Sequence, residues 1–104
     1  MDAITSAVAA VFVAFSVSVG MLIVGDYRFV VALRRSHPRT WEALGRPSPW
    51  FSRVEDVGAV HSFLHQRDYA ELGDAALIRL GDRLRALTIV TCVLGVAALV
   101  LATL

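Results

Sequence analysis

The residues best suited to chemistry in this sequence are two histidines, His61 and His65, which stand four positions apart. On a helix this spacing places both imidazoles on one face, where they can share a metal ion. No glutamate lies between them as in a zinc protease, and no cysteine or carboxylate pair elsewhere completes a tetrahedral set. Metal binding is therefore the minor alternative. The favoured interpretation is a packed or interfacial role, because His61 shares a helical stripe with Val57 and Leu64.

Other catalytic motifs are missing from the sequence. It contains no glycine-rich phosphate loop, no Gly-x-Ser-x-Gly turn and no Cys-x-x-Cys pair, and its single cysteine, Cys92, cannot form a disulfide within the chain. We therefore predict no enzymatic activity and no cofactor. The formal net charge of only +1 also argues against nucleic acid as a partner.

Two apolar stretches without charged residues occupy the ends of the chain, at about residues 3–25 and 86–104. Each is long enough to cross a hydrocarbon core of about 30 Å as a helix. Hydrophobic residues make up 57% of the chain, a composition that favours lipid as its main solvent. Positive charges follow the first stretch instead of preceding it, which argues against a cleaved signal peptide.

The basic residues predict the orientation of these spans. All ten are arginines, and all of them lie between the two apolar stretches. Because basic residues are retained on the cytoplasmic side, we expect both termini to be periplasmic and residues 26–85 to be cytoplasmic. This arrangement describes a two-pass membrane protein.

The predicted spans contain no Asp, Glu, Lys, Arg or His, which argues against a pump, a carrier or a haem anchor. Small residues recur there at helical spacing, so the two helix backbones can approach closely. We expect these faces to meet each other, with homo-oligomerisation as the alternative. The predicted helix–helix interface comprises Ser6, Ala10, Ala14, Ser18, Thr91, Gly95, Ala98 and Ala102.

Both spans are expected to continue as helices into the cytoplasm. The first runs over about 3–36 and stops at His37-Pro38, because the residue before a proline disfavours the helical conformation. The second covers 74–104, with Asp74 as its N-cap. Residues 37–73 form a cytoplasmic helical connection. The chain is thus predicted to be a single all-α membrane domain over 1–104, a two-span transmembrane helical hairpin with long cytoplasmic extensions.

Two short helices are expected within the connection. Pro38 opens the first and Gly45 ends it, while Ser52 and Glu55 form a capping box that opens the second. The second helix is expected to lie on the membrane surface, across the cytoplasmic extensions of the two long helices, or against a partner. Its predicted buried stripe is Val54, Val57, His61 and Leu64, with Glu55, Asp56 and Gln66 in water.

Arginines cluster where the connection meets each span, and there each gains about 1 kcal/mol from anionic headgroups. Alternatively, Arg79 and Arg83 pair with acids such as Asp82 or Glu71, and the remaining charge docks an acidic partner. Aromatic residues nearby suit the headgroup layer or a small packed core. The predicted lipid or partner contacts are Arg34, Arg35, Arg39, Trp41, Arg79, Arg83 and Arg85.

Scattered residues, none of them a catalytic signature, outline a layout that covers nearly the whole chain. They are Leu33-Arg34, His37-Pro38, Trp41, Gln66-Arg67, Asp74 and the basic stretch 79–85 before the second span. With them the chain resembles the universal stress protein B family, small two-span inner-membrane proteins of proteobacteria. The resemblance implies a bacterial inner-membrane protein associated with general stress or stationary-phase survival, such as alcohol tolerance.

The expected function is therefore that of a non-enzymatic integral membrane protein, acting through lipid or partner contacts of its arginine-rich segment. The alternative is an accessory subunit of a larger respiratory or transport complex. Anionic lipids are the expected partners in the first case, and another membrane protein in the second.

Overall fold

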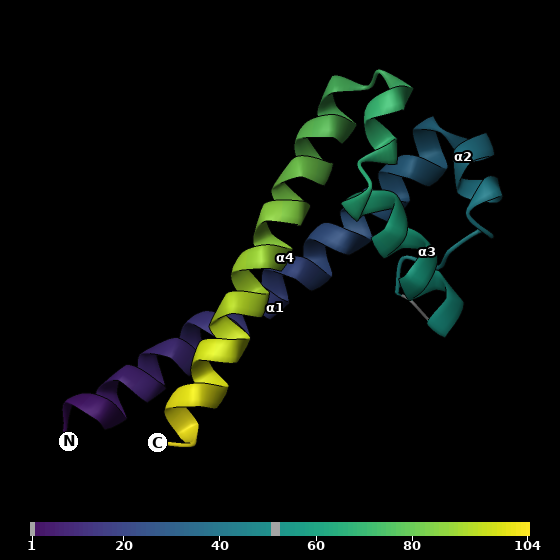
Figure 1. The fold of residues 1–104 in the computed structure, drawn as a ribbon. Helices are drawn as coiled ribbons and strands as arrows, with labels where there is room; N and C mark the ends of the chain where they lie inside the picture. The colour runs from purple at the N-terminus through teal and green to yellow at the C-terminus, as the bar shows by residue number, and fades with distance from the viewer. Residues whose placement is uncertain (1, 51–52) are drawn as a thin grey trace.

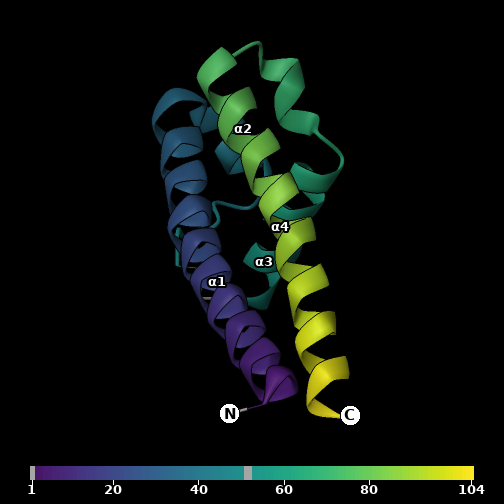
Figure 2. The same cartoon turned by 90° about the vertical axis from the view of Figure 1, so that its left-hand side faces the viewer.

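The computed structural model describes residues 2–50 and 53–104, and every regular element in these ranges is helical. Two long helices, α1 (Ala3–Ser36) and α4 (Ala75–Ala102), form the hairpin, and both chain ends lie at its open end (Figure 1). The connection contains α2 (Pro38–Ala43), α3 (Val54–His65) and the 3-10 helix η1 (Asp68–Leu72). Figure 2 shows α1 and α4 side by side, with the connection against one face of the pair. The predicted all-α hairpin is confirmed.

Local signals in the sequence explain where the long helices begin. Asp2 caps α1 by accepting a hydrogen bond from the Thr5 N–H at 2.7 Å. Asp74 caps α4 in the same way, accepting from the Leu77 N–H at 3.2 Å. The second oxygen of Asp74 lies 3.0 Å from Nε2 of His37, the residue that ends α1. One carboxylate therefore starts α4 and ties it to the end of α1.

The main cluster of buried hydrophobic residues lies within residues 26–85, which we call the headpiece. Phe29 of α1 packs edge-on against Tyr69 of η1, with ring centroids 5.8 Å apart, and Phe63 of α3 completes the aromatic cluster. Aliphatic side chains from the other elements surround these rings. They are Val30, Leu33, Val60, Leu64, Leu77 and Leu84.

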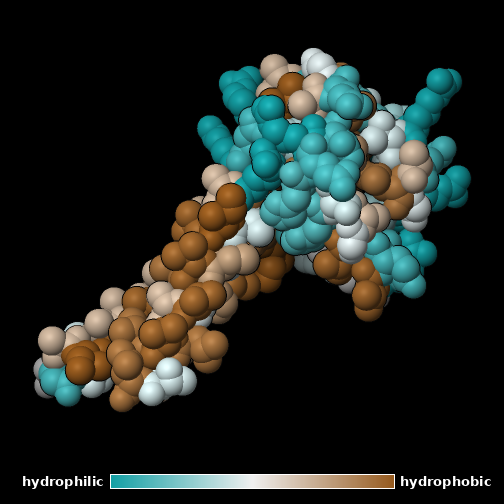
Figure 3. Space-filling view, in the orientation of Figure 1, coloured by the Kyte–Doolittle hydropathy of each residue, from teal (hydrophilic) through white to brown (hydrophobic). Residues whose placement is uncertain are grey.

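The remaining parts of α1 and α4, residues 3–25 and 86–102, are called the apolar arms. Both helices are long and apolar enough to cross a membrane. Only 6% of the most apolar window of α1 and 17% of that of α4 is buried, whereas the core helix of a soluble protein is mostly buried. Figure 3 shows the arms as a hydrophobic rod below the hydrophilic headpiece.

The two arms touch along one face of each helix. On this face the contacting residues are separated alternately by three and four positions. Ser18 and Thr91, both buried, share a hydrogen bond between their hydroxyl groups. Further along the interface, a Cβ added at Gly95 would lie 3.1 Å from the ring of Phe15. Ala98 of the predicted interface is also buried. The other predicted small residues are exposed, namely Ser6, Ala10, Ala14 and Ala102.

Helix geometry explains why most of the small α1 residues predicted at the interface lie outside it. The predicted residues repeat every four positions, and an α-helix completes a turn in 3.6, so each step drifts by about 40° around the axis. Only Ser18 falls on the face that meets α4. The less exposed positions Val8, Val11, Phe15, Ser18 and Leu22 follow the alternating spacing instead.

The buried face of α3 also differs from the predicted stripe. Val54 is 86% exposed and Val57 is exposed, whereas Asp56, expected in water, is only 2% exposed. Val60, Phe63 and Leu64 form the buried apolar face. The helix is thus rotated from the predicted position because Asp56 finds hydrogen-bond donors inside the headpiece. Ser52 of the predicted capping box lies outside the described residues.

A glycine sets how closely the core packs, and this can be tested. A Cβ at Gly81 of α4 would lie 2.5 Å from the buried ring of Tyr69. Gly81→Ala should therefore lower the free energy of unfolding by about 1–3 kcal/mol, since a rigid ring must move. The measurement is unfolding of the purified chain in detergent, followed by circular dichroism.

Gly58 of α3 provides the matched control, because a Cβ there meets nothing within 4 Å. Gly58→Ala should leave stability unchanged or raise it by up to about 1 kcal/mol, since alanine favours a helix. Equal stabilities of the two alanine variants would contradict the packing described for Gly81.

Candidate functional site

The exposed arginines of the headpiece are the groups most available for binding. Arg34, Arg35, Arg39, Arg79 and Arg83, all predicted contacts, are exposed. Their guanidinium groups suit phosphate or carboxylate recognition.

Trp41 and Arg85 from the same predicted set are partly buried. The Trp41 indole packs on the core and donates from Nε1 to the Pro47 carbonyl at 3.0 Å, while the Arg34 guanidinium lies 5.8 Å from its ring centroid. Trp41 therefore packs against the core of the headpiece on one side and makes a cation–π contact with Arg34.

One acidic residue of α4 is bound by neighbours that sequence reasoning did not identify. Arg67 donates from Nε and from its terminal nitrogen to the two carboxylate oxygens of Asp82, at 2.8 and 2.9 Å. The Tyr69 hydroxyl donates to the same carboxylate at 2.5 Å. The hydrogen bonds from Arg67 and then Tyr69 lower the pKa of Asp82 to about 2. Asp82 is therefore an anion committed to η1.

This network corrects the predicted pairing of Arg79 and Arg83. Asp82 is bound by Arg67, while Arg79 donates to the Ala75 carbonyl on its own helix. Within residues 2–50 and 53–104, neither Arg79 nor Arg83 forms an ion pair with a carboxylate. Their charge therefore remains available on the surface. The sequence signal that could have identified this region is Gly81, since a glycine inside a helix often marks close packing.

A second carboxylate folds the loop that precedes α3. Asp56 accepts from the Ser48 N–H at 3.2 Å and from Arg53 at 3.0 Å, and Arg53 also donates to the Gly45 carbonyl. Burial acts to raise the pKa of Asp56, but these hydrogen bonds outweigh it and hold the pKa below its ordinary value. The loop is thereby fixed against the start of α3.

An exposed apolar patch forms beside this loop. Trp50, 70% exposed, packs against Tyr27 of α1 with ring centroids 4.8 Å apart. Val54 and Val57, at the start of α3, are also exposed apolar side chains. The first turn of α3 points toward the end of the molecule where the chain termini lie (Figure 1). We call these four residues the aromatic patch.

The two histidines lie side by side on α3, with ring centroids 5.8 Å apart. In the described parts of the chain, no three His, Cys, Asp or Glu side chains come close enough to hold a metal ion. Burial raises the pKa of the nearby Asp26, an effect that the charges of His61 and His65 oppose. The two histidines therefore interact electrostatically with Asp26 of α1.

The Asp82 network predicts a specific dependence of stability on pH. Its folded-state pKa of about 2 lies below the unfolded value of about 3.9, so its contribution is complete above about pH 4 and is lost as the pH falls toward 2. Unfolding of the wild type and of Asp82→Asn should be compared across this range. The stability difference should be largest above pH 4 and should shrink toward pH 2.

Asp68→Asn is the control, because it removes a headpiece carboxylate outside this network. A stability difference between wild type and Asp82→Asn that stays constant down to about pH 2 would contradict the role assigned to the network.

Comparison with protein-family models, curated proteins and solved structures found no match. Membership of the universal stress protein B family therefore stays a prediction. The functional conclusion has to come from the geometry of the headpiece and the apolar arms.

Proposed function

We propose that this chain is a non-enzymatic two-span inner-membrane protein whose arginine-rich headpiece rests on the cytoplasmic leaflet. The observation that carries this proposal is the division of the molecule into a packed headpiece and apolar arms that are almost entirely exposed. Water does not tolerate so large an apolar surface, whereas lipid solvates it and the helices satisfy their own backbone groups.

The charge distribution supports the orientation. The ten arginines all belong to the headpiece, and none lies in either arm. Basic residues flanking a span remain cytoplasmic during insertion. Both ends of the chain then lie in the periplasm, because they meet at the far end of the rod (Figure 1).

The aromatic patch supports contact between the headpiece and the membrane surface. Trp50 and Tyr27 combine apolar rings with polar edges, the combination that is favoured at the headgroup layer. Val54 and Val57 would add apolar contact where the first turn of α3 points toward the membrane. The exposed arginines would then meet anionic headgroups in the same layer.

A role in stress survival rests on the sequence resemblance alone. It is compatible with a small protein that contacts lipid and has no catalytic site of its own. The exposed arms would equally suit a subunit of a larger membrane complex. Extraction in mild detergent separates these cases, since a subunit would be isolated with its partners at fixed stoichiometry.

Site-directed labelling tests the proposed topology. In a Cys92→Ala background, single cysteines replace two exposed residues, Glu71 of η1 and Thr103 at the end of α4. A membrane-impermeant maleimide should label Thr103→Cys in intact spheroplasts and Glu71→Cys only in inverted vesicles. Labelling of both positions from the same side would overturn the two-span arrangement, and the opposite pattern would overturn its orientation.

The stress role is tested separately by deleting the gene and challenging the cells with ethanol or prolonged stationary phase. Survival should fall and should be restored by the wild-type chain. An unaltered survival curve would contradict the stress role and leave the membrane topology unaffected.

A further inference from the structure

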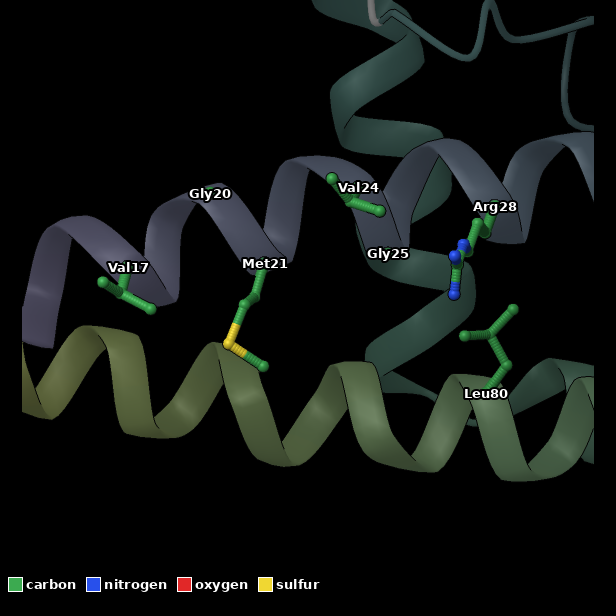
Figure 4. Close-up of a pocket in the computed structure, with 7 residues that line it drawn as sticks. All are labelled: Val17, Gly20, Met21, Val24, Gly25, Arg28 and Leu80. Atoms are coloured by element: carbon green, nitrogen blue, oxygen red, sulfur yellow. The ribbon is translucent and has the colours of Figure 1, made fainter.

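A groove of about 460 Å³ opens between α1 and α4 where the apolar arms meet the headpiece. This volume falls within the range of about 300–1,000 Å³ that is typical of ligand sites. Figure 4 shows Met21 of α1 reaching toward α4, and Arg28 and Leu80 pointing toward each other at the right-hand end of the groove, which is the end nearer the headpiece. The lining residues are Val17, Gly20, Met21, Val24, Gly25, Arg28 and Leu80.

Two glycines of α1 give the groove its shape. At Gly25 an added Cβ would lie 2.3 Å from a Leu84 methyl carbon, so the helices touch at this level. At Gly20 an added Cβ would meet nothing within 4 Å, although this residue lines the groove. The helices are therefore in contact at Gly25, and open space remains beside Gly20.

The headpiece end of the groove is positively charged. Arg28 lines it, and a second hollow beside it is lined by Arg79 and Arg83 and shares Leu80 with the groove. In the described ranges 2–50 and 53–104, none of these three arginines forms an ion pair with a carboxylate. An apolar groove thus ends beside three arginines that form no ion pair in these ranges.

We propose that this groove binds one anionic phospholipid, with an acyl chain along its apolar walls and the phosphate against Arg28, Arg79 and Arg83. The walls offer an acyl chain only aliphatic and thioether contacts. Guanidinium groups bind phosphate through paired hydrogen bonds, and the three charges favour an anionic headgroup over a zwitterionic one. This inference rests on the proposed function, because it requires the arms to lie in a bilayer.

Native mass spectrometry of the purified full chain tests the site, with phosphatidylglycerol and phosphatidylcholine of identical acyl chains as probes. One phosphatidylglycerol should be retained per chain in preference to phosphatidylcholine. Arg28→Ala should weaken phosphatidylglycerol binding about fivefold, the loss expected for one headgroup contact. Phosphatidylcholine binding should weaken less, because the choline group already offsets the charge of its phosphate. Arg46→Asn removes an equal charge outside the groove and outside the predicted lipid contacts, and asparagine tolerates the positive φ of this position, so it is the control.

Filling the groove provides a second, independent variant. Gly20→Leu should abolish selective lipid retention, because its side chain would occupy the space of the acyl chain. Gly58→Leu adds the same side chain to another open helical position and should leave retention intact. If Gly20→Leu does not fold, Val17→Phe fills the same groove from an exposed position.

Three outcomes would overturn the proposal. They are equal retention of the two lipids, selective retention that survives groove filling, and a chain dimer that Gly20→Leu dissociates, which would assign the groove to a second copy. If the cysteine labelling shows the predicted insertion but the chain has no lipid selectivity, only the proposed lipid site is contradicted. If the labelling contradicts insertion, the proposed function itself is contradicted.

Discussion

The packing of the headpiece depends on the burial of Tyr69 against α4. At the point of contact α4 has a glycine, Gly81, and therefore no side chain. The Tyr69 ring is fully buried, lies over Gly81 and packs edge-on against Phe29 of α1. A buried tyrosine needs a partner for its hydroxyl, and here Asp82 accepts that bond while Arg67 neutralises its charge. A single side chain therefore sets the spacing of α1, η1 and α4, and it determines which acid of α4 is occupied.

This arrangement has consequences for the rest of the molecule. Because the core lies in the headpiece, the arms are held together only by close helix contact and by the Ser18–Thr91 hydrogen bond. Such contacts are modest in strength and suited to lipid, where apolar side chains gain nothing by leaving the solvent. Because Asp82 is committed to Arg67, Arg79 and Arg83 have no acid to neutralise them within the described chain. The pairing of Asp82 with Arg67 and Tyr69 thus leaves Arg79 and Arg83 as a positive surface next to the arms.

Local signals made much of the fold predictable. Asp74 caps α4 as expected, Pro38 opens α2, and Gly45 follows α2 with a φ of 90° that few other residues adopt. Small residues of α4 predicted from alternating steps of three and four include the buried Thr91 and Ala98. The uniform four-residue series of α1 drifted off the interface, because spacing decides whether similar residues share a face.

The orientation of α3 could not be predicted in this way, since it depends on groups distant from any hydrophobic pattern. Asp56 turns inward because the backbone N–H of Ser48 and the side chain of Arg53 satisfy its oxygens. That rotation leaves Val54 exposed, as Trp50 also is, and exposed apolar side chains of this size are unfavourable in water. At a membrane surface the same exposure becomes favourable. The failure of the apolar pattern on α3 therefore supports the same proposal as the exposed arms do, namely that lipid surrounds the apolar surfaces of this chain.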